Sequence, residues 1–351
     1  MAEVLVAAVS AAVSDDASET VILDHGTGAR LSRELVETIA AELGPVYVGE
    51  MEDSAILSVA TGKLAVTTDS FVVQPAFFGN GDIGKIAVCG TVNDIAVSGA
   101  TPLYLTLGLI LEAGFPIAGL RRVIRSIRAA AEEAGVSIVA GDTKVVGKGA
   151  ADQIFINTTG VGEFRRRPLR MADVRPGDRI ILSGQIGNHA VHLLSIREGL
   201  GFEQRVKSDC APLNTLVDGV LSAVPDGAVR SIRDVTRGGL CAVMHEYSRA
   251  AGSRMEVRRA DIPVLWETAM GADMLGLDVI HLANEGCVAL FVDPEHAERV
   301  LSVVKAHEYG RDAAIIGEVG PTGTSGFVLV QKDGTAMEVD ELLGAEIPRL
   351  C

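Results

Sequence analysis

Along most of the 351-residue chain, short apolar runs with the spacing of β-strands alternate with amphipathic runs with the spacing of α-helices. This alternation predicts a mixed α/β (α+β) fold, in which helices cover the faces of sheets. The pattern predicts strands at residues 55–60, 64–68, 103–111, 136–140, 153–160, 179–183, 254–258, 287–292, 313–318 and 326–331. It predicts helices at residues 83–98, 116–134, 188–197, 212–223, 239–251, 264–275 and 294–306.

A charged, proline-containing segment at residues 164–170 (FRRRPLR) divides this pattern into two parts of similar size. Its basic run could bind a phosphate or a partner, but we interpret it as a solvated linker. We therefore expect an N-terminal extension (1–24), an N-terminal domain (25–168), a C-terminal domain (169–336) and a tail (337–351). The tail is acidic and ends in Cys351, and no pattern places its end in a core, so we expect it to be mobile.

Composition restricts the partners and the compartment. The 31 Lys and Arg residues against 46 Asp and Glu residues give a net charge of −15, which argues against binding to nucleic acids or anionic membranes. No apolar run reaches the ~18 residues that span a bilayer. The five cysteines include no C-x-x-C pair, which indicates the reducing cytoplasm. An anionic substrate would therefore be held locally, by metal ions or by backbone N–H groups.

Aspartates recur beside apolar runs in both predicted domains. Each one alone could cap a helix or begin a turn. Together they favour a Mg²⁺ site, because this hard cation binds carboxylates and bridges them to substrate phosphates. The candidate ligands are Asp53, Asp69, Asp94, Asp142 and Asp234.

Two glycine-containing segments could contact phosphate. Residues 78–85 (FGNGDIGK) open a predicted helix, where N–H groups and Lys85 could cradle a phosphate. The segment lacks the spacing of a Walker A loop, and such glycines can also simply make a turn. Arg237, which precedes Gly238 and Gly239, is open to the same two interpretations.

Three further features carry reactive groups. The Cys351 thiol is accessible, but its own α-carboxylate raises the pKa, so activation would have to come from elsewhere. Glu285 precedes an apolar strand and could be a general base or a turn residue. His189 and His192 are three residues apart and could pair on a metal, but we favour surface or capping roles. The internal cysteines lie in apolar runs, so we expect them in the core.

Several segments together resemble the HypE family of hydrogenase maturation proteins, which are carbamoyl dehydratases. The resemblance covers nearly all of residues 20–351. Its most specific pieces are residues 68–70 (TDS), 80–85 (NGDIGK), 93–100 (NDIAVSGA), 141–146 (GDTKVV), 149–152 (GAAD), 234–239 (DVTRGG), 284–286 (NEG) and 348–351 (PRLC). The aspartates alone would be explained by the wider superfamily of aminoimidazole-ribonucleotide and selenophosphate synthetases.

This resemblance implies a two-domain PurM-like fold. Its N-terminal α/β domain binds ATP and dimerises by joining sheets into a barrel, and a C-terminal α/β domain and a mobile tail follow. A HypF-type carbamoyltransferase would load a carbamoyl group onto the terminal cysteine sulfur. The protein would dehydrate this S-carboxamide to a thiocyanate with ATP. The cyanide would then pass to iron on a HypC–HypD complex, for the [NiFe] hydrogenase centre.

The resemblance also assigns roles to single residues. The catalytic residues would be Cys351 as the carrier, Glu285 as the base and Lys144 as a second group in proton transfer. Mg²⁺ on the aspartates would neutralise the phosphates, and Lys144 and Lys85 would stabilise the transferring phosphoryl group. The nucleotide would contact Lys85, Asn93, Gly141, Thr143 and Arg237.

Two departures from the family pattern stand out. Residues 25–29 read HGTGA where family members commonly have HGSGG, which puts a close backbone contact there in doubt. Leu350 replaces a usual isoleucine, which is an apolar exchange of little consequence.

Two other functions fit parts of the sequence. A superfamily kinase or synthetase acting on a free small molecule would turn over without the tail. A non-catalytic thiol carrier would present Cys351 but would not bind ATP, and the aspartates would then have no explanation.

Overall fold

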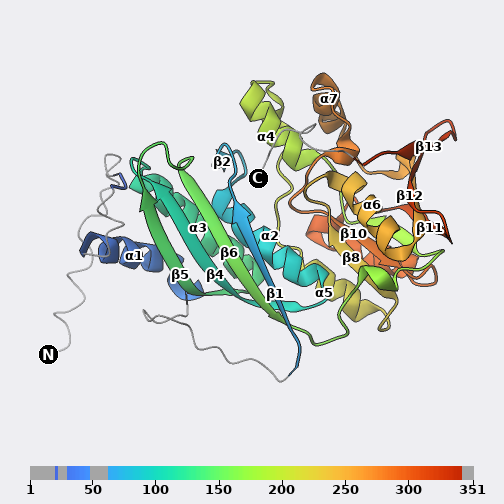
Figure 1. The fold of residues 1–351 in the computed structure, drawn as a ribbon, viewed down its shortest axis with the longest axis horizontal. Helices are drawn as coiled ribbons and strands as arrows, with labels where there is room; N and C mark the ends of the chain where they lie inside the picture. Colours follow the sequence, from blue (N-terminus) through green and yellow to red (C-terminus); the bar gives the residue numbers. More distant parts are fainter. Residues whose placement is uncertain (1–19, 23–29, 48–61, 342–351) are drawn as a thin grey trace.

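The computed structural model describes residues 20–22, 30–47 and 62–341 of the chain (Figure 1). The predicted strand at 55–60, the glycine-rich residues 25–29, Asp53 and Cys351 lie outside the described residues. The described elements form two adjoining units of sheet and helix, which confirms the mixed α/β prediction.

The elements follow the chain with short 3₁₀ turns between some of them. The first unit contains α1 (Arg30–Leu43), β1 (Leu64–Phe71), β2 (Phe77–Phe78), β3 (Gly81–Asp82), α2 (Ile83–Val97), β4 (Thr101–Glu112), α3 (Ile117–Ala134), β5 (Ser137–Val146) and β6 (Ile154–Glu163). The second contains β7 (Arg179–Leu182), α4 (Asn188–Glu198), α5 (Asn214–Ala223), β8 (Val229–Asp234), α6 (Gly239–Ala251), β9 (Ser253–Arg258), α7 (Trp266–Met274), β10 (Val288–Val292), α8 (Ala297–Ala306), β11 (Ala314–Thr322), β12 (Gly326–Val330) and β13 (Ala336–Val339).

The first unit is built on a four-stranded sheet in the order β1-β6-β4-β5, in which only β4 and β5 run parallel. Helices α2 and α3 cover one face of this sheet (Figure 1). No described element covers the other face, on which Val66 is 65% and Ile110 41% exposed. We call this the open face. Since Ile110 pairs directly with Lys144, and Gly108 with Asp142, these two β5 side chains also lie on it.

Local signals explain the ends of the helices beneath the sheet. Asp82 is the N-cap of α2, and its carboxylate accepts hydrogen bonds from the backbone N–H groups of Gly84 (2.9 Å) and Lys85 (3.2 Å). Helix α3 ends at Gly135, which has φ 68° and so terminates the helix in the left-handed conformation. Both helices therefore have the bounds that the sequence predicts to within one residue.

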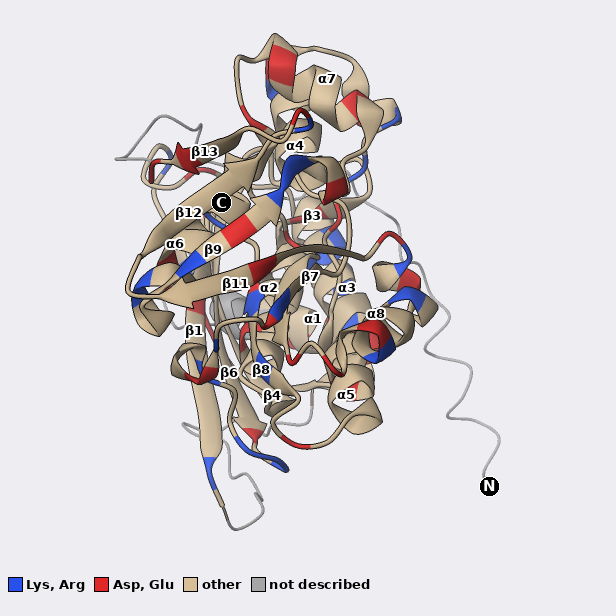
Figure 2. Cartoon of the chain, turned by 90° about the vertical axis from the view of Figure 1, so that its right-hand side faces the viewer, with Lys and Arg blue, Asp and Glu red and all other residues tan. Residues whose placement is uncertain are grey.

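The second unit is built on a seven-stranded sheet in the order β13-β12-β9-β11-β7-β10-β8, with a single parallel pair, β12 and β9. Its two faces differ in polarity. On β9, Met255 and Val257 are fully buried, whereas the intervening positions are charged, and red and blue alternate along this strand (Figure 2). The sheet therefore presents a mixed-charge outer face rather than a basic one.

Helix α2 joins the two units, because it also packs against α5 and β8. Asn93 on α2 is buried, and its side chain spans the junction. Its Nδ2 donates to the carbonyl oxygen of Ala211 (3.0 Å), and its Oδ1 accepts from the N–H of Leu213 (2.7 Å). The side-chain amide of Asn93 therefore links the backbone of the second unit to α2 of the first.

Helix α6 holds the chain beyond β13. His245 Nε2 donates to the carbonyl oxygen of Val339 (2.9 Å), and Arg249 forms a two-pronged ion pair with Glu341 (2.6 and 3.2 Å). The sequence predicts that the tail begins at residue 337, but residues 337–339 belong to β13 and pair with β12. The core therefore extends further along the chain than expected.

Other strands depart from the prediction because of sheet pairing. The predicted strand at 136–140 continues to Val146 as β5, because β4 pairs with it through residue 146 despite the turn-forming residues Gly141 and Asp142. The strands β8 and β13 and the helix α1 were not expected. None of the described helices combines the length and the apolar character that a bilayer span requires.

Candidate functional site

An acidic cluster lies where the first unit meets the second. In the first unit, Asp94 of α2 accepts a hydrogen bond from Thr67 Oγ1 on β1 (3.0 Å), and Asp69 of β1 accepts one from Thr91 Oγ1 on α2 (2.8 Å). These crossed bonds hold both carboxylates at the junction of strand and helix. The sequence predicts both aspartates but not their threonine partners.

The second unit supplies the rest of the acidic cluster from the end of β8 and the turn before α6. Asp234 accepts a hydrogen bond from Thr236 Oγ1 (2.9 Å), and Arg233 Nε lies 3.9 Å from its other carboxylate oxygen. Arg237 is exposed and interacts electrostatically with Asp69. We define the acidic cluster as Asp69, Asp94 and Asp234 with the cations Arg233 and Arg237.

The carboxylates of this cluster are close enough to disturb one another. Burial, with the negative charges of Asp234 and Asp69, raises the pKa of Asp94 to about 6. Burial also raises the pKa of Asp69, while the Thr91 hydrogen bond and the charge of Arg237 act in the opposite direction. Three mutually repelling carboxylates are typical of a site that receives a cation.

The cluster fits a Mg²⁺ ion that is shared with phosphates. Oδ1 of Asp234 is buried and has no hydrogen-bond partner among the described residues, as a ligand position would. Within the same residues, no group of three His, Cys, Asp or Glu side chains has the arrangement of a complete metal site. Mg²⁺ commonly binds one or two carboxylates and takes its other ligands from water and substrate phosphates.

A second group of side chains contains Glu285, which is 5% exposed. Its other members are Lys85 from α2 and Asp209 and Cys210 from the second unit. The pKa of the Cys210 thiol is raised by its neighbour Cys89 and by burial, and further by the Glu285 charge, while Lys85 opposes these effects. Lys85 and the predicted base Glu285 therefore belong to one interdomain group.

The glycine-rich segment before α2 is a two-stranded hairpin, β2 and β3. The sequence suggests that N–H groups at this helix start could cradle a phosphate. However, Asp82 occupies the N–H groups of Gly84 and Lys85. These two N–H groups are therefore not available to a phosphate, and the charge of Lys85 acts on Asp209 and Cys210.

Three predicted site residues on β5 lie apart from the acidic cluster. Asp142 and Lys144 form an ion pair with each other (2.9 Å) on the open face, with side chains 69% and 66% exposed. Asp69 lies on the opposite face and three strands away, so Asp142 does not join the other aspartates within one protomer. Gly141 lies where a Cβ would come 2.9 Å from the carbonyl oxygen of Leu107, which indicates a strand-packing role.

Two further residues predicted to contact the nucleotide, Asn93 and Thr143, have other neighbours in the structure. The side-chain amide of Asn93 is committed to the backbone of the second unit, as described above. Thr143 on β5 is half-buried and pairs with Leu109 on the covered face of the sheet. Neither residue contacts the acidic cluster through a described hydrogen bond.

The surface or capping roles expected for His189 and His192 are wrong, because both residues are fully buried. His189 Nδ1 hydrogen-bonds Ser208 Oγ (2.8 Å), and His192 Nδ1 donates to the carbonyl oxygen of Val206 (2.7 Å). Both rings meet Phe78 edge-on. Burial lowers the pKa of His189 to about 3, so this ring is neutral in the core. The sequence pattern could not show the burial of these two histidines, because α4 is enclosed by the protein on most sides.

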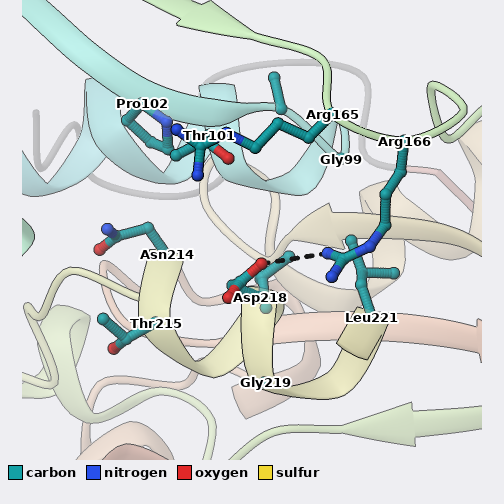
Figure 3. A pocket seen from close by; sticks show the side chains of 12 residues that line it. Gly99, Thr101, Pro102, Arg165, Arg166, Asn214, Thr215, Asp218, Gly219 and Leu221 are labelled. Carbon is teal, nitrogen blue, oxygen red and sulfur yellow. Dashed lines mark hydrogen bonds and ion pairs between the residues drawn. The ribbon is translucent and has the colours of Figure 1, made fainter. Parts of the chain in front are cut away.

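A cavity of about 280 Å³ lies between the units, beside the linker (Figure 3). Arg165 and Arg166 line it, and Arg166 pairs with Asp218 of α5 (3.0 Å). Its lining contains none of the residues of the acidic cluster. The guanidinium groups of the linker therefore pair with nearby carboxylates, Arg165 with Glu163 (2.7 Å), rather than forming an open phosphate site.

The internal cysteines Cys89, Cys210, Cys241 and Cys287 are buried and form no disulfide, which confirms the prediction that they are core residues. Asp209 was missed entirely. Its only sequence signal is the glycine that faces it, Gly286, and that pairing becomes visible only in the fold.

Comparison with known proteins identifies the class to which this fold and site belong. The chain matches the AIR synthase related protein models, the N-terminal domain over residues 51–164 and the C-terminal domain over residues 175–330. It therefore belongs to this class of two-domain proteins.

Within this class, the chain belongs to the HypE family of carbamoyl dehydratases, which are hydrogenase maturation proteins. It is 44% identical to the carbamoyl dehydratase HypE of Azotobacter vinelandii over 329 residues, 93% of this chain and 96% of that protein. A crystal structure of HypE in complex with ATP matches with a TM-score of 0.90 and 40% identity, over 95% of this chain and all of that one. A HypE–HypF complex matches with a TM-score of 0.77 and 43% identity, over 81% and 92% of the two chains.

Proposed function

We propose that this protein dehydrates an S-carboxamide on Cys351 to a thiocyanate at the expense of ATP, and so supplies the cyanide ligand of a [NiFe] hydrogenase. Family membership supports the reaction, and the ATP complex of a relative supports the nucleotide. The observation that carries the proposal is the acidic cluster, in which burial and mutual repulsion raise the pKa of Asp94 and one Asp234 oxygen lacks a hydrogen-bond partner.

The chemistry assigns different tasks to the two groups of residues. An amide oxygen is a poor leaving group, and its phosphorylation by ATP converts it into a good one. Mg²⁺ held by Asp94 and Asp234 would neutralise the phosphates. Arg237 and Lys85 would stabilise the transferring phosphoryl group. Two protons must leave the carboxamide nitrogen for a nitrile to form. Glu285 would accept one of them, and the departing phosphate would carry away the other, so that loss of phosphate leaves the nitrile.

We assign two kinds of partner from the same reasoning. A HypF-type carbamoyltransferase would load Cys351, as the HypE–HypF complex of a relative suggests. A HypC–HypD complex would receive the cyanide on iron. The unpaired cysteines of the described residues are consistent with a cytoplasmic location for these exchanges. We also keep the division into domains at 25–168 and 169–336 as a proposal.

A second copy of the chain is the proposed occupant of the open face. Val66 and Ile110 expose apolar surface there, and two such faces joined together would bury it. Lys144 and Asp142 would then lie between the two protomers. In that position Lys144 could reach reacting groups that it cannot reach within one protomer.

The decisive experiment is intact-mass spectrometry of the full chain after exposure to the transferase, carbamoyl phosphate and ATP. We expect the carbamoyl mass first and then the loss of one water. Cys351→Ala should prevent both changes while leaving ATP binding intact, and Cys287→Ala, in the core, should prevent neither. Carbamoylation of Cys351→Ala would refute the proposal.

ATP consumption and ATP binding, measured beside the protein mass, separate the alternatives. A superfamily kinase or synthetase would consume ATP with a free metabolite after removal of residues 346–351. A thiol carrier would gain the carbamoyl mass but would neither bind ATP nor lose water.

A further inference from the structure

The short loop that carries Glu285 is held from one side by its neighbour Asn284, which is fully buried. Asn284 Oδ1 accepts from the N–H of Gly187 (2.7 Å), and its Nδ2 donates to the carbonyl oxygens of Val235 (2.8 Å) and Leu282 (3.1 Å). Every hydrogen-bonding atom of this amide is therefore used to fix the loop.

Asp209 holds the same loop from the other side. Its Oδ1 accepts from the N–H of Glu285 (3.1 Å), and its Oδ2 accepts from the N–H of Gly286 (3.1 Å). A Cβ at position 286 would lie 1.9 Å from the carbonyl oxygen of Asp209, so only glycine permits this approach. One carboxylate thus accepts hydrogen bonds from two consecutive backbone N–H groups, the first of which belongs to Glu285. We call this pair of hydrogen bonds the grip.

Asp209 is itself fixed by bonds that cross between the two units. Its neighbour Ser208 exchanges two backbone hydrogen bonds with the side chain of Asn80, at 2.8 and 3.0 Å. Ser208 Oγ also bonds to His189 Nδ1 (2.8 Å) and accepts from the N–H of Cys210 (3.2 Å). The hairpin before α2 therefore determines where the Asp209 carboxylate lies, and through it the Glu285 loop.

We propose that Asp209 is a positioning residue for the dehydration, which fixes the backbone of Glu285 so that the base points at the carboxamide. The proposal rests on the proposed function, because it needs Glu285 to be the base. Asp209 also lines a cavity of about 200 Å³ together with Gln185, Asn188 and Asp312. A purely structural role in that cavity is the alternative that the experiment must exclude.

The double grip needs two acceptor oxygens. An asparagine at this position would keep one oxygen but would turn an NH₂ group toward one of the two N–H donors. The titratable groups around the carboxylate are Lys85 from α2 and Cys287, the residue before β10, besides Glu285 on the loop itself. Burial raises the pKa of Asp209 to about 6, so the grip weakens as the pH falls through that value.

The test compares Asp209→Asn with Asp312→Asn, an exposed carboxylate that lines the same cavity and does not touch the loop by a described hydrogen bond. The full chain is loaded by the transferase, and thiocyanate formation is followed by mass spectrometry at several ATP concentrations between pH 5 and 8. For Asp209→Asn we expect kcat to fall about 10- to 100-fold with the KM for ATP changed less than about twofold. The ratio of wild-type to Asp209→Asn activity should fall toward one as the pH drops below 6, because the wild-type carboxylate is protonated there, and Asp312→Asn should match the wild type at every pH.

Amide hydrogen exchange on the same samples tests the grip without any reference to activity. The amides of Glu285 and Gly286 should exchange faster in Asp209→Asn than in the wild type or in Asp312→Asn. If the exchange rises but the wild type forms no thiocyanate, the proposed function fails while the grip stands. Unchanged exchange, or a kcat equal to that of Asp312→Asn, overturns the proposal. If Asp209→Asn does not fold, Asp209→Glu, which keeps the charge but moves the oxygens, is judged by the same criteria.

Discussion

Replacing Asn93 by alanine should destabilise the protein strongly, because its buried amide joins the two units. The substitution leaves the carbonyl of Ala211 and the N–H of Leu213 without their partner, and these two residues are 2% and 0% exposed. Each orphaned buried group costs about 1–3 kcal/mol. For the two groups together we therefore expect a loss of about 2–6 kcal/mol in the free energy of unfolding.

Urea unfolding followed by far-ultraviolet circular dichroism measures this loss, and Asp333→Ala is the control. Asp333 also accepts a hydrogen bond from a backbone N–H, that of Thr335 (2.9 Å), but it lies in an exposed turn away from the open face. Water replaces this bond, so the control should lose less than about 1 kcal/mol. Equal midpoints for the two variants would refute the reasoning. ATP affinity should survive in Asn93→Ala, since its amide makes no described contact with the acidic cluster.

Two further predictions follow from the site and from the open face. The pKa of Asp94 is raised from 3.8 to about 6, so the folded state holds the extra proton between these values and stability falls as the pH rises through that window. Asp94→Asn should therefore stabilise the protein by about 3 kcal/mol at pH 7.5 and by close to nothing at pH 3.5, measured in urea titrations. ATP turnover should be lost, and equal effects on stability at both pH values would contradict this assignment. Val66→Glu on the open face should convert a dimer to a monomer in analytical ultracentrifugation, whereas Trp266→Glu, at the same 65% exposure on α7, should not. A dimer that survives Val66→Glu would remove the open face as its interface.

The parts of the fold that could be predicted are those whose signals are local. Helix α2 follows from its apolar spacing and its Asp82 cap, and α3 ends at Gly135, where only glycine adopts the required backbone without strain. Strand β13 could not be predicted, because Met337 and Glu338 are exposed and the segment gains its structure from pairing with β12. The continuation of β5 beyond residue 140 depends in the same way on pairing with its neighbour β4.

The same distinction between local and long-range signals applies to the residues of the candidate site. Asp69, Asp94 and Asp234 were predicted because a carboxylate at the end of an apolar run is visible in one dimension. Asp142 shares that signal, but side chains alternate between the two faces along β5, and this alternation places Asp142 on the open face, opposite to Asp69. Asp209 was invisible because its role depends on two amides 76 and 77 residues further along the chain.

The hold of α6 on residues 339–341 gives the last ten residues of the chain a fixed origin. At about 3.3 Å per residue, a sulfur at position 351 lies at most about 33 Å from Glu341. A group that covalent linkage confines within this distance has an effective concentration in the millimolar range. The dehydration step would then be first order in loaded protein and insensitive to dilution, and dilution would slow only the encounters with separate partners.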